Sequence, residues 1–227
     1  MLWNEEAVRD NIRNREGKRV FYLSKEDLLT SGARDFLSRE RIEILPAQLA
    51  KPERYRLECG GYLEGKPEHM THLNAEILVP KTHPRIRFRG KMDTLEAELI
   101  LCQLEDSELV SPVGEILALA RQILRCDVLE QPLKWDKLCG LTEEQQRQRS
   151  HFPQTFYNQP HFMPSASDGA VIARLNRARC VAREAELSAL EAYCDHAGNP
   201  SRTDIPQALN RMSSMLYILM IQQKGKL

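Results

Sequence analysis

The feature that most constrains the fold is a series of long helical patterns between residue 70 and the end of the chain. Apolar residues recur near the 3.6-residue period of an α-helix within residues 90–106, and another apolar stripe follows a typical helix start at residues 111–112. Longer helices are expected over about residues 167–195 and 203–223. Several amphipathic helices joined by short connections pack into an antiparallel bundle, so the expected fold class is mainly α.

The segments between these helices carry weaker signals. Residues 142–145 form a capping box, in which a Thr side chain and a Gln three residues later close a helix start. Pro84 indicates that the basic stretch at residues 81–91 is extended at first. Residues 151–168 contain three prolines and few periodic apolar positions, so a loop is expected there.

The N-terminal part of the chain differs from the rest and predicts a small α+β appendage. A strand is expected at residues 18–23 and a second strand at residues 42–45. Between them, Thr30 is a good cap for a helix over residues 32–39.

A cluster of Pro and Gly at residues 46–68 is interpreted as a linker or irregular loop. The length of 227 residues suits one large domain with a small addition. Two domains are therefore expected, namely the appendage with its linker at residues 1–68 and the helical bundle at residues 69–227.

The charged residues balance, with 32 Lys and Arg against 32 Asp and Glu. A dedicated nucleic-acid-binding domain normally carries a basic excess, because phosphate contacts supply much of its affinity, so this class is excluded. No apolar run approaches the roughly 20 residues of a membrane helix, and the N-terminus carries no signal-like pattern. The chain is therefore expected to be cytoplasmic and to bind neither nucleic acid nor a membrane.

The cysteines lie far apart, at positions 59, 102, 126, 139, 180 and 194. None of them has the Cys-x-x-Cys spacing of a zinc ribbon or a thioredoxin-like site. In a cytoplasmic chain they are expected to be reduced, and several are interpreted as small core residues.

Although the net charge of the chain is zero, the cationic residues concentrate in two segments. Residues 81–91 hold five cations and no acid, and the helix expected at residues 167–195 carries its arginines ahead of its acids. This order opposes the helix dipole, which favours acids early and cations late. Arg179 and Arg183 are four residues apart and share one helix face, which suits a polyphosphate. A solvated face with Arg179 paired to an acid is the alternative.

Polar residues interrupt the apolar pattern of the last helix at Asn210, Arg211 and Ser214. Asn210 and Ser214 are four residues apart and share a face. Polar groups inside a bundle need hydrogen-bond partners, which leaves two interpretations open: a structural network between helices, or a ligand site.

Four segments have the form of motifs. They are Lys81-Thr82-His83-Pro84-Arg85 leading to Gly90-Lys91-Met92-Asp93-Thr94-Leu95, then His161-Phe162-Met163-Pro164, then Ala178-Arg179-Cys180-Val181-Ala182-Arg183-Glu184-Ala185-Glu186, and last Leu209-Asn210-Arg211-Met212-Ser213-Ser214. In this order and spacing they resemble the ATP:cob(I)alamin adenosyltransferases, and within that family the ethanolamine-utilisation type. The resemblance covers about residues 70–222.

The resemblance implies a five-helix (ferritin-like) antiparallel bundle that forms a homo-oligomer, expected to be a trimer with a dimer as the alternative. ATP and cobalamin would bind at the subunit interface. By position, Arg179, Arg183 and Asn210 match residues that hold ATP or its Mg²⁺. Asp93 matches the partner of Arg179 in a salt bridge across that interface.

Further matches have less defined roles. Four of them match motif positions of the family without a defined function, namely Lys81, Arg85, Glu186 and Arg211. His161 or Phe162 falls where the family has a hydrophobic residue that displaces the lower axial ligand of cobalamin. There the displacement makes the cobalt four-coordinate and easier to reduce.

The sequence departs from the family pattern at several points. The Gly-rich ATP loop of the propanediol-utilisation branch is absent, as it is in the ethanolamine branch. Glu184 stands in place of an arginine, and Ser214 in place of an aspartate. Some ethanolamine-branch members carry a metal motif of one His and three Cys. Of this motif only Cys59 remains, with His69 and His72 nearby, so no bound structural metal is expected.

The implied reaction moves the 5′-deoxyadenosyl group of ATP to cob(I)alamin and releases triphosphate. Co(I) is the nucleophile, so no catalytic Ser, Cys or His is required, and no triad-like pattern is present. Arg179, Arg183 and Mg²⁺ would stabilise the leaving group. Ethanolamine ammonia-lyase or its reactivase is the expected partner, within the cytoplasm or a bacterial microcompartment. A non-catalytic nucleotide- or phosphate-binding helical module and a structural bundle in a larger assembly are the alternatives.

Overall fold

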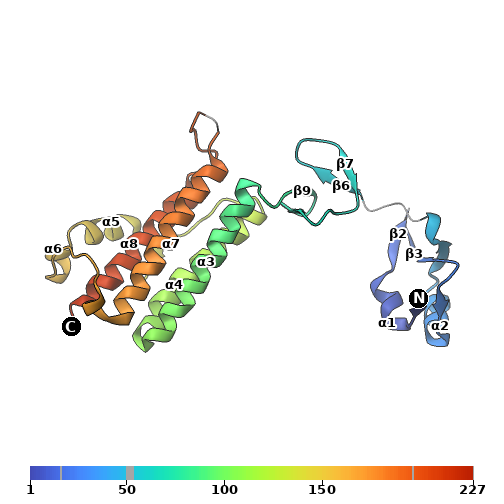
Figure 1. Ribbon diagram of the computed structural model, residues 1–227, viewed down its shortest axis with the longest axis horizontal. Coiled ribbons are helices and arrows are strands. Elements are labelled where there is room, and N and C mark those ends of the chain that lie inside the picture. Colours follow the sequence, from blue (N-terminus) through green and yellow to red (C-terminus); the bar gives the residue numbers. More distant parts are fainter. Residues whose placement is uncertain (16, 50–53, 196, 227) are drawn as a thin grey trace. The chain divides into compact units, whose positions relative to one another are not determined.

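The computed structural model describes residues 1–15, 17–49, 54–195 and 197–226 (Figure 1). The chain divides into two compact units. The first comprises Met1–Tyr55 with Tyr62–Gly65, and the second comprises Arg56–Gly61 with Lys66–Leu227.

The first unit is a small α+β fold with a three-stranded sheet. In this sheet β3 (Lys18–Leu23) pairs antiparallel with β2 (Arg13–Arg15) and parallel with β5 (Glu43–Pro46). The crossover between the parallel strands is α2 (Ser31–Arg39), and the Thr30 hydroxyl caps it by accepting a hydrogen bond from the Ala33 amide at 3.3 Å. The strands, the helix and the cap that the sequence predicts here are therefore confirmed.

Apolar side chains from the sheet, from α1 (Glu5–Asp10) and from α2 form the core of the first unit. Its buried members are Val8, Phe21, Ala33, Phe36, Leu37 and Ile42, and the edge of the Trp3 ring packs against Phe21. The other elements of this part of the chain are β1 (Leu2–Trp3), β4 (Leu28–Leu29), a 3₁₀ turn at Ala47–Leu49, β6 (Arg54–Leu57) and β7 (Tyr62–Glu64).

The segment predicted as a linker or irregular loop contains ordered strands, so that prediction is wrong in part. Residues Arg56 and Leu57 of β6 pair in parallel with β9 (Ile77–Pro80), and β8 (Met70–His72) pairs antiparallel with β9. These strands are stabilised by partners some twenty residues away, which a local pattern of Pro and Gly does not reveal.

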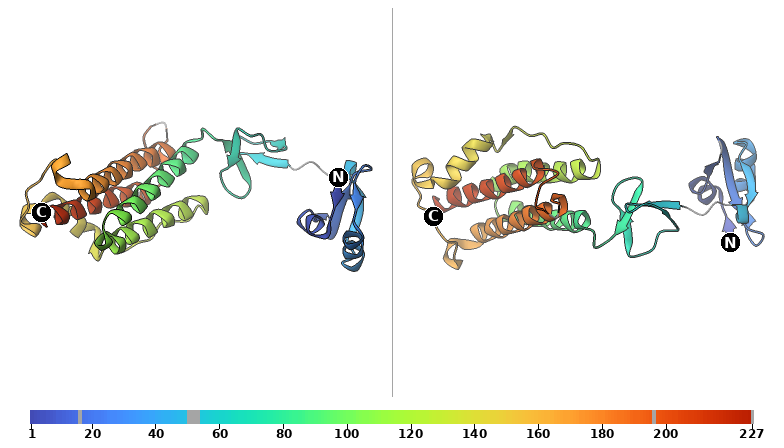
Figure 2. Two further views of the ribbon diagram at one scale, coloured as in Figure 1. Left: turned by 60° about the horizontal axis from the view of Figure 1, so that its bottom comes forward. Right: turned by 90° about the horizontal axis from the view of Figure 1, so that it is seen from above.

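Among the described residues of the second unit, four long helices form a bundle, and Figure 2 shows them lying side by side. They are α3 (Pro84–Glu105), α4 (Val110–Val128), α7 (Gly169–Tyr193) and α8 (Asp204–Lys224). α7 packs against both α3 and α8, α3 packs against α4, and the shorter α5 (Glu143–His151) packs against α8. The predicted helical bundle with an α+β appendage is confirmed.

Shorter elements connect these helices. They are the 3₁₀ turn Ser107–Leu109, the hairpin of β10 (Lys137–Leu138) and β11 (Leu141–Thr142), α6 (Pro153–Tyr157) and the 3₁₀ turn Ala166–Asp168. Both hydrogen bonds of the predicted capping box at Thr142 and Gln145 are present. No helix in the described ranges combines the length and the apolar composition that crossing a membrane requires.

Two helices begin at prolines in stretches where the sequence predicts extended or irregular chain. α3 begins at Pro84 rather than near residue 90, because His83 is extended and its Nδ1 accepts a hydrogen bond from the Arg85 amide at 3.2 Å. α6 likewise begins at Pro153, within the predicted loop. The first turn of a helix needs no amide donor, so a proline starts the helix while it keeps the preceding residue extended.

α7 presents a row of small buried residues to its neighbours. Ala178, Ala182, Ala185 and Ala189 are fully buried and follow helical spacing. Small side chains let helix axes approach closely. Larger buried side chains of α3 and α8 share the same core and fill the space around this row.

A buried carboxylate joins three helices at one end of the bundle. Asp127 of α4 is fully buried and accepts hydrogen bonds from Arg85 Nε at 2.9 Å, from Arg89 Nε at 2.5 Å, and from the Tyr193 hydroxyl at the end of α7. Burial, and then the bond to Asp127, raises the pKa of Tyr193 well above its usual value, so its hydroxyl remains a donor. Arg85 also contacts the half-exposed Glu130 at 2.9 Å.

We expect Asp127→Asn to lower the free energy of unfolding by about 3 kcal/mol, because two largely buried arginines lose their shared charge partner. Glu130→Gln is the matched control, since Glu130 is 54% exposed and binds the same Arg85. Its cost should stay within about 1 kcal/mol. Urea denaturation of both variants measures the difference, and equal costs would contradict the central place of Asp127.

Candidate functional site

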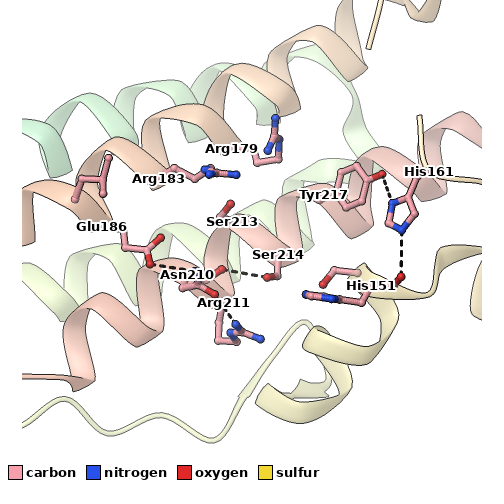
Figure 3. Close-up of a pocket in the computed structure, with 12 residues that line it drawn as sticks. His151, His161, Arg179, Arg183, Glu186, Asn210, Arg211, Ser213, Ser214 and Tyr217 are labelled. Carbon is pink, nitrogen blue, oxygen red and sulfur yellow. Dashed lines mark hydrogen bonds between the residues drawn. The ribbon is translucent and has the colours of Figure 1, made fainter. Parts of the chain in front are cut away.

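A cavity of about 480 Å³ lies between α7 and α8, a size typical of small-molecule sites (Figure 3). The end of α5 and the loop that follows α6 complete its rim. The cavity is lined by Ser150, His151, His161, Arg179, Arg183, Glu186, Leu187, Asn210, Arg211, Ser213, Ser214 and Tyr217.

The α7 wall carries two guanidinium groups that no described carboxylate neutralises. Arg179 is half-buried and donates from Nε and from one terminal nitrogen to Asn176 Oδ1, at 3.1 and 2.9 Å. Arg183, one turn later, is exposed and forms no hydrogen bond or ion pair with any residue that the structure describes. Asn176 is neutral, so both positive charges remain available to an anion.

The other arginines of α7 differ from this pair. Arg174 Nε lies 3.1 Å from Glu105, and Arg177 Nε lies 3.2 Å from Glu98, both on α3. The ion-pair interpretation of the basic helix therefore applies to Arg174 and Arg177. At Arg179 and Arg183 the geometry favours an anionic ligand.

The α8 wall is a polar network that reaches across to α7. Asn210 Nδ2 donates to Glu186 Oε1 at 3.0 Å, and Asn210 Oδ1 accepts from a terminal nitrogen of Arg211. The Ser214 hydroxyl donates to the main-chain oxygen of Asn210 at 3.2 Å. Asn210 thus joins the two helices and also faces the cavity, so the structural network and the candidate site share the same residues (Figure 3).

Arg211 has one further hydrogen-bond donor that no described residue uses. Its Nε is buried and has no hydrogen-bond partner among the described residues. A buried donor without a partner is costly. An anion in the cavity beside it would remove that cost.

The rim of the cavity contains an aromatic cluster. The His161 ring stacks on the Tyr217 ring with centroids 6.0 Å apart, and its Nδ1 lies 3.0 Å from the Tyr217 hydroxyl. Phe162, the next residue, packs on Tyr217 at 6.2 Å and against the bundle core. Of the two residues that the sequence analysis singles out here, His161 therefore lines the cavity, while Phe162 packs on Tyr217 and does not line it.

Three other candidate residues lie outside the cavity. Lys81 is exposed and pairs with Glu68 at 3.0 Å, and Arg85 belongs to the buried Asp127 cluster. Asp93 is exposed on α3 and forms no ion pair within the described chain. Six predicted residues are thus brought together, and they are Arg179, Arg183, Glu186, Asn210, Arg211 and His161.

Several lining residues are not identified from the sequence. Ser213 and Tyr217 follow Asn210 at three and seven residues, so helical periodicity alone places them on its face. Ser150 and His151 end a short helix that has no apolar stripe, and no local signal marks them.

Metal-binding capacity in the described part of the chain is limited. It contains no group of three or more His, Cys, Asp or Glu side chains placed to hold an ion. Among the described lining residues Glu186 is the only carboxylate. The arrangement therefore suits a polyanion that arrives with its own cation, such as a magnesium-bound polyphosphate.

We expect Arg183→Ala to weaken the binding of inorganic tripolyphosphate by about 10- to 100-fold, the loss of one charge-assisted hydrogen-bonding group. The melting temperature should stay unchanged, because Arg183 is exposed and forms no hydrogen bond or ion pair with a described residue. Arg177→Ala, on the same helix but outside the cavity, should leave the affinity unaltered. Isothermal titration calorimetry with all three proteins measures this, and equal affinities would remove the cavity as an anion site.

Known proteins support the resemblance. The model of the cobalamin adenosyltransferase family matches residues 61–223. Corrinoid adenosyltransferase EutT of Salmonella typhimurium (strain LT2) is 30% identical over 246 residues, which span 98% of this chain and 92% of the relative. The protein of the same name from Escherichia coli (strain K12) is 37% identical over 164 residues, which span 72% of this chain and 61% of the relative.

The matched region contains all four motifs and both walls of the cavity. It covers well over half of the chain, and the resemblance to the ethanolamine-utilisation type is confirmed. The chain belongs to the cobalamin adenosyltransferase family.

Proposed function

We propose that the cavity between α7 and α8 binds the triphosphate of ATP while the 5′-deoxyadenosyl group passes to cob(I)alamin. The chain is a corrinoid adenosyltransferase of the ethanolamine-utilisation type, as its family and relatives indicate. The observation that supports this site is the pair Arg179 and Arg183, one turn apart in the cavity and without a carboxylate partner in the described ranges.

The transfer forms a cobalt–carbon bond and breaks the bond between C5′ and the adjacent triphosphate oxygen. Both electrons of the new bond come from Co(I), which becomes formally Co(III), and the electron pair of the broken bond leaves with the triphosphate. No side chain has to act as nucleophile or base. The chain's task is to position the substrates and to stabilise charge.

Arg179 and Arg183 supply the charge stabilisation. Negative charge grows on the triphosphate as the bond to C5′ breaks, and donors already in place need no reorganisation to meet it. The two hydrogen bonds that Arg179 donates to Asn176 Oδ1 fix its guanidinium and leave its other terminal nitrogen for a phosphate oxygen. Arg183 is less constrained and adjusts to the second phosphate.

The donor set at the cavity fits Mg²⁺ held by phosphates and one carboxylate. Glu186 is that carboxylate, and the hydrogen bond from Asn210 at 3.0 Å orients it. Mg²⁺ bound there would neutralise part of the triphosphate charge.

We assign the shielding of cobalt from water and from its lower axial ligand to His161 and Phe162. His161 is exposed at the rim, and the Phe162 ring is half-buried against Tyr217. Excluding water strengthens the electrostatic interactions within the site.

A homo-oligomer, with a trimer preferred to a dimer, completes the proposed site. Asp93 is exposed, and the family resemblance makes it the partner of Arg179 of a neighbouring subunit. Ile100, Leu101 and Leu104 lie further along the same helix with 41%, 37% and 77% of their surface exposed. A contact between subunits would cover this apolar surface.

The product, adenosylcobalamin, would serve ethanolamine utilisation. Ethanolamine ammonia-lyase or its reactivase is the proposed partner, in the cytoplasm or in a bacterial microcompartment. This part of the proposal is supported by the sequence resemblance.

The full chain, incubated with ATP and chemically reduced cobalamin, should form a light-sensitive cobalt–carbon bond that is visible in its absorption spectrum. Arg179→Ala should lower kcat/KM by about 10²- to 10³-fold, the usual cost of losing a preorganised donor. Arg174→Ala, on the opposite side of α7 in an ion pair with Glu105, should change it little. ATP binding without bond formation would leave a non-catalytic nucleotide-binding module instead.

Glu186→Gln tests the magnesium contact. Glutamine still accepts the hydrogen bond from Asn210 but has no charge, so the Mg²⁺ concentration for half-maximal ATP binding should rise about tenfold. Glu191→Gln, the same removal of charge five residues later on α7 and outside the cavity, is the control. Calorimetric ATP titrations across Mg²⁺ concentrations provide the measurement, and overlapping curves for wild type and Glu186→Gln would exclude Glu186 as a ligand.

A further inference from the structure

Tyr217 is the point where the loop at the rim meets the polar wall of the cavity. It lies on α8 seven residues after Asn210 and three after Ser214, so these three residues share one helix face. Its ring contacts both His161 and Phe162, with centroids at 6.0 and 6.2 Å and interplanar angles of 8° and 23°. A single side chain thus supports two consecutive loop residues, and Figure 3 shows its contact with the first of them, His161.

The hydrogen bonds of His161 define what Tyr217 does. His161 Nε2 lies 3.1 Å from the main-chain oxygen of His151, the last residue of α5. A carbonyl oxygen only accepts, so Nε2 carries the proton. In the neutral ring Nδ1 is then an acceptor, and the Tyr217 hydroxyl donates to it at 3.0 Å.

This bonding connects three segments at the rim. A carbonyl at the end of a helix lacks a partner within the helix, and His161 satisfies that of α5. Tyr217 holds the other side of the same ring on α8. The orientation of the loop beside the cavity is therefore set by one imidazole between two fixed groups.

The far end of the loop has a separate attachment to α8. Lys224 Nζ lies 2.5 Å from Asp168 Oδ1, and Asp168 in turn accepts from the Ser165 amide at 2.6 Å. Tyr217 and Lys224 are seven residues apart, so both attachments lie on one face of α8. Loss of the Tyr217 contact would therefore free the His161 ring at the rim while Asp168 stays bound to Lys224.

We propose that Tyr217 is a positioning residue for the adenosyl transfer, which holds His161 and Phe162 at the rim so that they act on the cobalamin substrate. This inference rests on the proposed function. It adds a residue on α8, on the same face as Asn210 and Ser214, that contacts the loop assigned to the cobalamin substrate. Tyr217 itself is not required to touch either substrate.

The test uses the full chain with ATP and cob(II)alamin and measures the four-coordinate fraction by electron paramagnetic resonance. Tyr217→Phe keeps the ring but removes the hydroxyl donor, and this fraction should fall about three- to tenfold. Tyr217→Leu also removes the stacking and should lower it further. ATP affinity and the melting temperature of the Phe variant should match the wild type, and KM for cobalamin should rise while KM for ATP stays constant.

Tyr157→Phe is the matched control. Tyr157 is on α6, packs against the same core, and its buried hydroxyl has no hydrogen-bond partner among the described residues. The change is chemically identical to Tyr217→Phe and should leave the four-coordinate fraction as it is.

Three results would overturn the inference. One is an unchanged fraction in Tyr217→Phe with a wild type that forms product. Another is a fall accompanied by equal losses in ATP affinity and melting temperature, which marks a structural role. A wild type that forms no cobalt–carbon bond would instead overturn the proposed function, and this inference with it.

Discussion

The buried carboxylate of Asp127 is the interaction on which the rest of the bundle depends. A charge removed from water must be met by charges and donors of good geometry, or the folded state is lost. Asp127 therefore requires the start of α3, with Arg85 and Arg89, and the end of α7, with Tyr193, to meet at the end of α4. With these ends fixed, the register of α7 is set. The cavity residues of α7, which lie six to fourteen residues before Tyr193, then face α8.

The sequence predicts the elements whose signals are local. The capping box at Thr142, the cap at Thr30 and the long patterns of α7 and α8 all depend on residues within one or two turns. The errors have the opposite origin. Pro84 and Pro153 start helices where the rule for the preceding residue suggests an end, and β6 exists because it pairs with β9. Proline signals are ambiguous between the two sides of a helix boundary, and strand pairing is not local.

The candidate residues also separate into those whose place the sequence predicts and those whose place depends on distant partners. Arg179, Arg183 and Asn210 could be predicted from spacing and resemblance, because helical periodicity fixes the face on which they lie. Arg85 is also an arginine within a motif, but its partner is Asp127, 42 residues later in the chain. No local sequence signal near Arg85 predicts that pairing. The net charge of zero also does not reveal which arginines have an acidic partner and which do not. Arg174 and Arg177 are compensated by acids on the neighbouring α3, whereas Arg179 and Arg183 face the cavity without a carboxylate partner among the described residues.

The row of alanines on α7 has a consequence for this cavity. Ala182 and Ala185 are fully buried and flank Arg183 in the sequence, so the side chains that set the spacing of the helices are the neighbours of one that faces the cavity. The width of the cavity is thus set by how closely the methyl groups of these alanines let the helices pack. A larger side chain in that row would act as a wedge and separate the arginines from Asn210 without altering any group that meets a ligand. The buried alanines of α7, which carry no reactive group, therefore determine the width of the cavity.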